Sequence, residues 1–119
     1  MPALRSRRDF DRIQAQGRSR GGRLMAIRFV SNGRDHDRIA ISTGRRLGGA
    51  VVRNTVRRRI RAIIHGSDAL VRAPGPVSGG RDLLIVARPA SADATFPELQ
   101  ASLVSLLRSI PLSRPDPTP

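Results

Sequence analysis

The segment from Gly44 to Arg61 constrains the fold more than any other part of the chain, because it contains seven arginines and no acidic residue. Four apolar residues recur in and just after this segment at the spacing of an α-helix: Val52, Val56, Ile60 and Ile63. Arg53, Arg57 and Arg61 form a second stripe, roughly 100° around the same helix from the apolar one. The pattern therefore predicts a helix over 50–65 that buries one side and leaves an arginine face free.

The positive charge of the chain is concentrated in its first half. Residues 1–65 contain 17 arginines and four aspartates, which accounts for the whole formal net charge of +13. Arginines four residues apart repel one another and cost a helix about 0.2–0.5 kcal/mol per pair, so a helix serving stability alone would include glutamates. Arginine also presents a planar fork of donors that matches phosphate. The pattern predicts a nucleic-acid partner; an anionic membrane is disfavoured because the apolar stripe is Val and Ile, and the chain has no Trp or Tyr.

Periodicity and capping signals predict the remaining elements in chain order: a helix at 6–16, a short edge strand at 18–20, strands at 22–30 and 37–43, a strand at 82–88 and a helix from Thr95 to about Ser109. Asn32-Gly33 marks the turn between the two middle strands. Thr95 and Glu98 form a capping box. The order α-β-β-β-α-β-α predicts one α+β domain over 1–110, with a small sheet and helices mainly on one face. A flexible loop is expected at 73–81, and the proline-rich tail 111–119 is expected to be disordered.

Other residue patterns do not predict catalytic or metal chemistry. The chain has no cysteine, which excludes disulfides and thiolate metal sites. Asp35-His36-Asp37 resembles a metal site but lies in the predicted turn, where polar residues are expected. Asp9 and Asp11 are two residues apart on a helix and do not share a face. We therefore expect no catalytic residue and no metal site in this chain.

Targeting signals are also missing from the pattern. The basic N-terminus is not followed by an apolar run, which argues against a secretory signal peptide. The longest apolar run, Leu83–Ala87, is far short of the roughly 20 residues that a membrane span needs. We expect a cytoplasmic protein.

The stretch from Arg45 to Arg61 resembles the signature of the bacterial ribonuclease P protein. It has two basic residues before glycine, then Ala-Val, then Arg53-Asn54, then further arginines on a helix. The flanking segments are also similar to the family: its first helix, its strand ending in Ala-Arg-Pro and its last helix. The resemblance implies a compact α/β sandwich with a small mixed sheet and a left-handed crossover through the basic helix.

The resemblance implies a role as the protein subunit of a ribonucleoprotein endonuclease. In that family a large RNA is the catalyst, and the protein assists it in removing the 5′ leader from precursor tRNA. The implied partners are ribonuclease P RNA and precursor tRNA, with Mg²⁺ held mainly by the RNA and with no membrane or small-molecule substrate. A purely structural RNA-binding protein, such as a ribosomal protein, fits the size and charge equally well.

The resemblance also assigns residues to two surfaces. The residues implied to bind the catalytic RNA are Arg45, Arg46, Arg53, Asn54, Arg57, Arg58 and Arg61. Those assigned to a leader-binding cleft between the first helix and the sheet are Phe10, Ile13, Gln14, Ala26, Arg28, Ala40 and Ser42. Three residues depart from the family pattern: Thr55 replaces an arginine, and Gln14 and Arg28 replace aromatic residues. Arg28 could compensate by stacking on a base or pairing with a phosphate.

Overall fold

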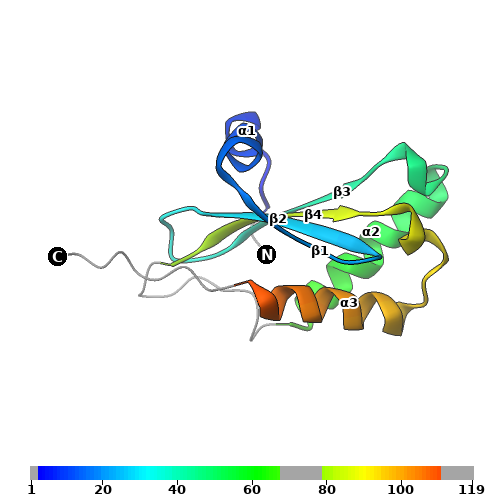
Figure 1. Cartoon of the computed structure of the whole chain (residues 1–119). Coiled ribbons are helices and arrows are strands. Elements are labelled where there is room, and N and C mark those ends of the chain that lie inside the picture. Colours follow the sequence, from blue (N-terminus) through cyan, green and yellow to red (C-terminus); the bar gives the residue numbers. More distant parts are fainter. Residues whose placement is uncertain (1–2, 68–78, 111–119) are drawn as a thin grey trace.

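The computed structural model describes residues 3–67 and 79–110 (Figure 1). Its elements are α1 (Arg7–Gln16), β1 (Arg18–Gly21), β2 (Met25–Ser31), β3 (Arg38–Thr43), the 3₁₀ turn η1 (Arg45–Leu47), α2 (Ala50–His65), β4 (Arg81–Ala87), the 3₁₀ turn η2 (Pro89–Asp93) and α3 (Phe96–Ser109). The predicted α+β order is confirmed, and the two 3₁₀ turns are additions to it. The predicted tail 111–119 and most of the predicted loop 73–81 lie outside the described residues.

The four strands form one mixed sheet in the order β1-β2-β4-β3. β2 is antiparallel to both β1 and β4, whereas β3 lies at the edge and is parallel to β4. Parallel neighbours require a crossover connection, and here it runs through α2. The mixed sheet is therefore as predicted, and the left hand of the crossover stays a prediction from the resemblance.

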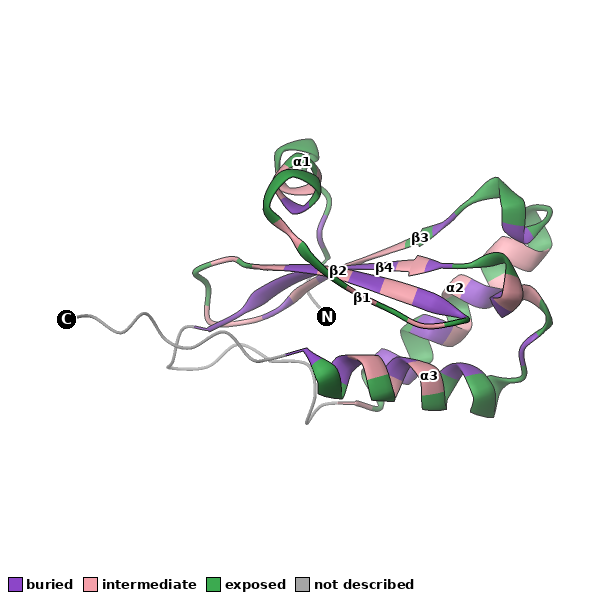
Figure 2. Ribbon diagram, in the orientation of Figure 1, coloured by how far each residue is buried: buried purple, intermediate pink, exposed green. Residues whose placement is uncertain are grey.

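The helices cover both faces of the sheet (Figure 1). α2 and α3 lie together on one face and enclose the main core with alternate residues of the strands (Figure 2). α1 lies on the opposite face, so the expectation of helices mainly on one face holds for α2 and α3 alone. Since the central strand β4 is covered on both sides, six of its seven residues are buried, whereas β2 alternates between buried and half-buried positions.

The contact between α1 and the sheet is small. Ile13 is the one fully buried residue of α1, and it packs in a separate cluster with Leu4 and Leu84. Phe10 and Val30 are half-buried at the edge of this cluster. Within residues 3–67 and 79–110, no helix combines the length and apolar character needed to cross a membrane.

Candidate nucleic-acid interface

The residues predicted to bind RNA lie on η1 and α2, and we call this set the arginine face: Arg45, Arg46, Arg53, Asn54, Arg57, Arg58 and Arg61. Five of these side chains are exposed, while Arg53 and Arg57 are half-buried. The ion pairs formed between described residues use Arg12, Arg23, Arg38 and Arg81, and none uses an arginine of η1 or α2. The charge of this surface is thus left uncompensated by the described acidic residues.

The inner border of the arginine face is anchored to β3. Ile64 is buried beside the predicted apolar stripe, so the buried side of α2 is wider than predicted and reaches the Arg53–Arg57 row. The Arg57 guanidinium donates to Thr43 Oγ1 at 2.5 Å and to Asn54 Oδ1 at 3.2 Å. These bonds hold Arg57 against the end of β3 and leave the outer arginines free to meet a partner.

Two further residues of α2 use their side chains in hydrogen bonds within the protein. The Arg59 guanidinium donates to the Ala94 carbonyl at 3.2 Å and so ties α2 to the end of η2. Thr55, which stands where the family has an arginine, donates its hydroxyl to the Val51 carbonyl at 2.8 Å within the helix. Neither residue belongs to the free basic surface.

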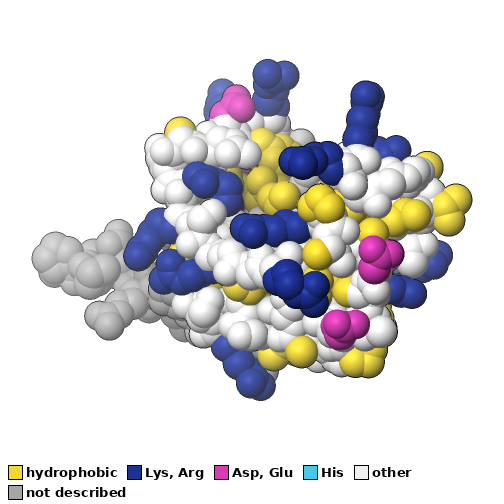
Figure 3. Space-filling model, turned by 45° about the vertical axis from the view of Figure 1, so that its right-hand side comes forward, with side chains coloured by type: hydrophobic (Ala, Val, Ile, Leu, Met, Phe, Trp, Pro, Cys, Tyr) yellow, Lys and Arg dark blue, Asp and Glu magenta, His cyan; other side chains and the backbone are white. Residues whose placement is uncertain are grey.

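The residues predicted to line the leader cleft lie on the sheet face that carries α1. The strand register places Ala26, Val86 and Ser42 in one row across the sheet. Val86 packs against the cluster around Ile13, Ala26 is half-buried and Ser42 is exposed. Figure 3 shows hydrophobic side chains lying among arginine side chains on one face of the molecule. We refer to the sheet face that carries α1, with Ala26, Arg28, Ala40 and Ser42 on its strands, as the predicted leader cleft, or leader cleft for short.

The structure sorts the predicted cleft residues into exposed and buried ones. Phe10 is half-buried, Gln14 is exposed, and Ile13 has no exposed surface. Ile13 therefore supports the cleft from within and is not available to contact a ligand. Ala40 lies in the second row of the floor, beside Leu84.

The side chain of Arg28, on β2, donates hydrogen bonds to α1. Its Nη2 donates to the carbonyl oxygens of Ile13, Gln14 and Gly17 at 3.2, 3.1 and 3.0 Å. Its Nε is buried without a hydrogen-bond partner among the described residues. Sequence reasoning treated this side chain as a group that faces the RNA, whereas its bonds are to the C-terminal end of α1.

A second group of side chains holds the part of α1 that contains Asp9 and Arg12. We call this group the aspartate cluster: Asp82 with Arg38, Arg12, Asn32 and Asp9. Arg38 binds both carboxylate oxygens of buried Asp82 at 2.9 and 2.8 Å, Arg12 of α1 binds it at 2.6 Å, and Asn32 at 2.9 Å. Asp9 of α1 pairs with Arg38 at 3.1 Å. Burial opposes ionisation, but the hydrogen bonds from Arg38 and Asn32 outweigh it and hold the pKa of Asp82 below its ordinary value. The cluster therefore keeps α1 on the sheet by charge where the apolar contact is small.

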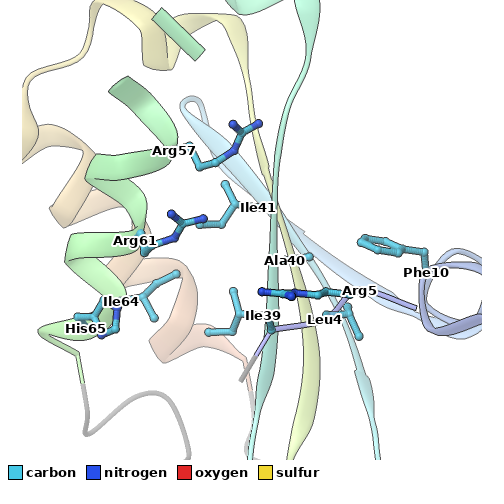
Figure 4. A pocket seen from close by; sticks show the side chains of 11 residues that line it. Leu4, Arg5, Phe10, Ile39, Ala40, Ile41, Arg57, Arg61, Ile64 and His65 are labelled. Carbon is cyan, nitrogen blue, oxygen red and sulfur yellow. The ribbon is translucent and has the colours of Figure 1, made fainter. Parts of the chain in front are cut away.

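A hollow of about 320 Å³ lies along the edge strand β3, between α2 and the N-terminal segment (Figure 4). Arg57 and Arg61 extend from α2 toward β3, and Phe10 lies on the other side of that strand (Figure 4). Arg5 and His65 also line the hollow. Sequence reasoning missed Arg5, which belongs to no periodic pattern, and interpreted His65 as a helix end. The hollow connects the arginine face with the leader cleft around the edge of the sheet.

The Asp35-His36-Asp37 segment is only partly a surface turn. Asp37 is fully buried and forms an ion pair with Arg81, with Nη2–Oδ2 at 2.7 Å. His36 Nδ1 lies 2.6 Å from Oδ1 of Asp35, whose side chain is 45% exposed. Asp37 lies in the turn as predicted, but its side chain is buried in this ion pair and has a structural role that the sequence did not indicate. In the part of the chain that the structure describes, no three His, Cys, Asp or Glu residues are grouped so as to hold a metal ion.

Comparisons with known proteins agree with the geometry. The family model for Ribonuclease P matches residues 2–111. The ribonuclease P protein component of Streptococcus mutans is 30% identical over 105 residues, which cover 88% of this chain and 82% of that protein. The corresponding protein of Alkaliphilus metalliredigens is 27% identical, with 92% of this chain and 93% of that protein covered.

Solved structures show the same fold. The ribonuclease P protein of Staphylococcus aureus superposes with a TM-score of 0.77 at 28% identity, covering 96% of this chain and 99% of that one. The protein of Thermotoga maritima gives a TM-score of 0.79 at 27% identity, with coverage of 93% and 99%. The chain therefore belongs to the ribonuclease P protein family and is the protein subunit of that ribonucleoprotein endoribonuclease of tRNA processing.

Proposed function

We propose that the arginine face binds the catalytic RNA of ribonuclease P and that the leader cleft receives the single-stranded 5′ leader of precursor tRNA. The observation that carries the first part is the uncompensated charge of η1 and α2. A stable helix gains nothing from unpaired like charges four residues apart, whereas each phosphate that an arginine neutralises releases counterions and adds affinity. Membership of the family supplies the RNA partner.

The side chains of the leader cleft support the proposal of a single-stranded ligand. Its floor of small side chains, Ala26, Ser42 and Val86, is bordered by half-buried Phe10. The accessible part of the Phe10 ring offers one stacking platform, and stacking is worth about 1–3 kcal/mol per base in single-strand binders. The edge strand β3 lies between the cleft and the arginine face, so one RNA can occupy each surface at the same time.

The role of this chain in the reaction is to hold and orient RNA. The buried carboxylates that the structure describes are engaged by arginines: Asp82 by Arg38 and Arg12, and Asp37 by Arg81. Mg²⁺ favours carboxylate oxygens with few competing cations and retains several waters. We propose that the catalytic Mg²⁺ is held mainly by the RNA, and that the holoenzyme acts in the cytoplasm.

Reconstitution with a ribonuclease P RNA tests this proposal. Adding the chain should restore precursor-tRNA cleavage at a low magnesium concentration at which the RNA alone is inactive. A purely structural RNA-binding protein would bind the RNA without restoring cleavage. Phe10→Ala should weaken binding of precursor tRNA but not of mature tRNA, whereas Arg58→Ala should weaken assembly with the catalytic RNA.

A further inference from the structure

The C-terminal end of α1 depends on the sheet for its hydrogen bonds. The last carbonyls of a helix have no partners within the helix and carry the negative end of its dipole. α1 has no basic residue in its last turn, and it ends at Gly17 in an extended conformation. Arg28, one strand away on β2, is the residue that donates to this end, at Ile13, Gln14 and Gly17.

No other side-chain hydrogen bond between described residues reaches this end of α1, and the chain continues from it directly into β1, where Arg18 pairs with Phe29 of β2. The aspartate cluster acts through Asp9 and Arg12, which reach Arg38 of β3 and Asp82 of β4, and Arg12 also donates to the Ser31 carbonyl at the far end of β2. The apolar contact is made by Ile13, with Phe10 at its edge. Loss of the Arg28 bonds would therefore leave the last carbonyls of α1 without these donors and loosen the C-terminal turn above β2, while the chain that follows stays paired in β1.

We propose that Arg28 is a positioning residue for the leader cleft, because it fixes the C-terminal end of α1 and so sets the distance between the helix and the floor. This inference rests on the proposed leader function of the cleft. It assigns Arg28 an indirect role, in place of a stacking or phosphate contact with the leader.

The hydrogen bonds favour the indirect role. One nitrogen of the guanidinium serves three carbonyls, and Nε is buried without a partner among the described residues. A guanidinium held in this way cannot turn to face a base without breaking its bonds to α1. The contact with Gln14 is to its backbone carbonyl, so the exposed side chain of Gln14 is not needed for the arrangement.

The salt dependence of leader binding separates positioning from direct contact. Holoenzymes would be reconstituted with wild-type protein, Arg28→Met, Arg28→Lys and, as a matched control, Arg34→Met. Arg34 is exposed in the turn between β2 and β3 and lies outside both proposed RNA surfaces, so Arg34→Met removes the same charge at another place. Affinity for precursor tRNA with a leader of several nucleotides, and for mature tRNA, would be measured at several salt concentrations.

We expect Arg28→Met to weaken precursor binding about tenfold, equivalent to ~1.4 kcal/mol, at every salt concentration. Mature tRNA should bind unchanged, and the slope of log affinity against log salt should stay that of wild type. Arg28→Lys should recover part of the loss, since an ammonium can donate to the same carbonyls. Arg34→Met should match wild type.

Three results would overturn the assignment. A slope made shallower by roughly 0.7–0.9 in Arg28→Met would show a lost phosphate contact. A lower Tm with unchanged precursor affinity would show a role in stability alone. A wild-type holoenzyme that binds both RNAs equally would remove the proposed leader function itself, and the inference with it. If Arg28→Met does not fold, Arg28→Lys carries the same test, with a smaller loss and an unchanged slope expected.

Discussion

Asp82→Asn should destabilise the protein strongly, because it removes the one negative charge on which two arginines converge. The Asp82 side chain has no exposed surface, while Arg38 and Arg12 keep 15% and 30% of theirs. Removing one partner of a buried ion pair costs about 3–5 kcal/mol, since the other charge is left without compensation. Both arginines are partly exposed to water and Arg38 keeps its ion pair with Asp9, so we expect a loss at the lower end, about 3 kcal/mol.

A loss of this size is easy to measure. In a domain of this length each 1 kcal/mol lowers Tm by roughly 4–8 °C, so Asp82→Asn should lower it by roughly 12 °C or more. Urea denaturation should show a lower midpoint with an unchanged slope. Asp93→Asn is the matched control, because Asp93 is exposed in η2 and should change stability by less than about 0.5 kcal/mol.

The effect should also depend on pH, with a definite sign. The pKa of Asp82 is held below its ordinary value, so the folded state binds this proton less readily than the unfolded state. The stabilisation is therefore fully present above the unfolded value, about 3.9, and is lost as the pH falls through the lowered folded value. The stability difference between wild type and Asp82→Asn should be constant near neutral pH and shrink below about pH 4. Asp82→Asn within 1 kcal/mol of wild type at pH 7 would refute the reasoning.

Three further predictions concern other parts of the molecule. Ile60→Asp should unfold the domain, because it places an unpaired charge in the main core. Arg58→Ala should keep the wild-type Tm and weaken binding to ribonuclease P RNA. The opposite pattern would show that the predicted register of α2 is wrong. The affinity for that RNA should fall with salt with a log–log slope steeper than about −4, as several phosphates are neutralised, and a slope near −1 would contradict a polyanion site. Gly80→Ala should cost about 1–3 kcal/mol in thermal unfolding, because a Cβ there would collide with the His36 carbonyl; a wild-type Tm would show that the turn can move aside.

The secondary structure was predictable because each element carries its own local signal. The helix over 50–65 matches α2 in the structure, and the capping box at Thr95 and Glu98 forms as predicted. For elements predicted from the spacing of their apolar residues, the predicted ends lie within a few residues of the ends in the structure. The placement of α1 on the second face was not predictable, because two apolar residues on a short helix do not indicate which face of a sheet they cover.

The candidate site was predictable where one helix carries it and unpredictable where distant segments meet. The arginine face is local to η1 and α2, so its residues could be grouped from the sequence. The bonds from Arg28 to α1 depend on the register of β2 and on where α1 crosses it. The buried pairs of Asp37 and Asp82 join residues more than 40 positions apart, and no spacing rule in a single sequence connects them.

The separate seating of α1 has a consequence for how the molecule opens. α1 rests on a cluster of three buried residues, whereas α2 and α3 share a core of eighteen. Local opening follows the weakest contacts, so α1 should detach in a sub-global fluctuation that leaves the main core closed. Its backbone amides should then exchange with solvent much faster than those of α2. A strand of RNA seated against α1 would add its binding free energy to this one helix, so occupancy of the cleft should be visible as selective protection of α1.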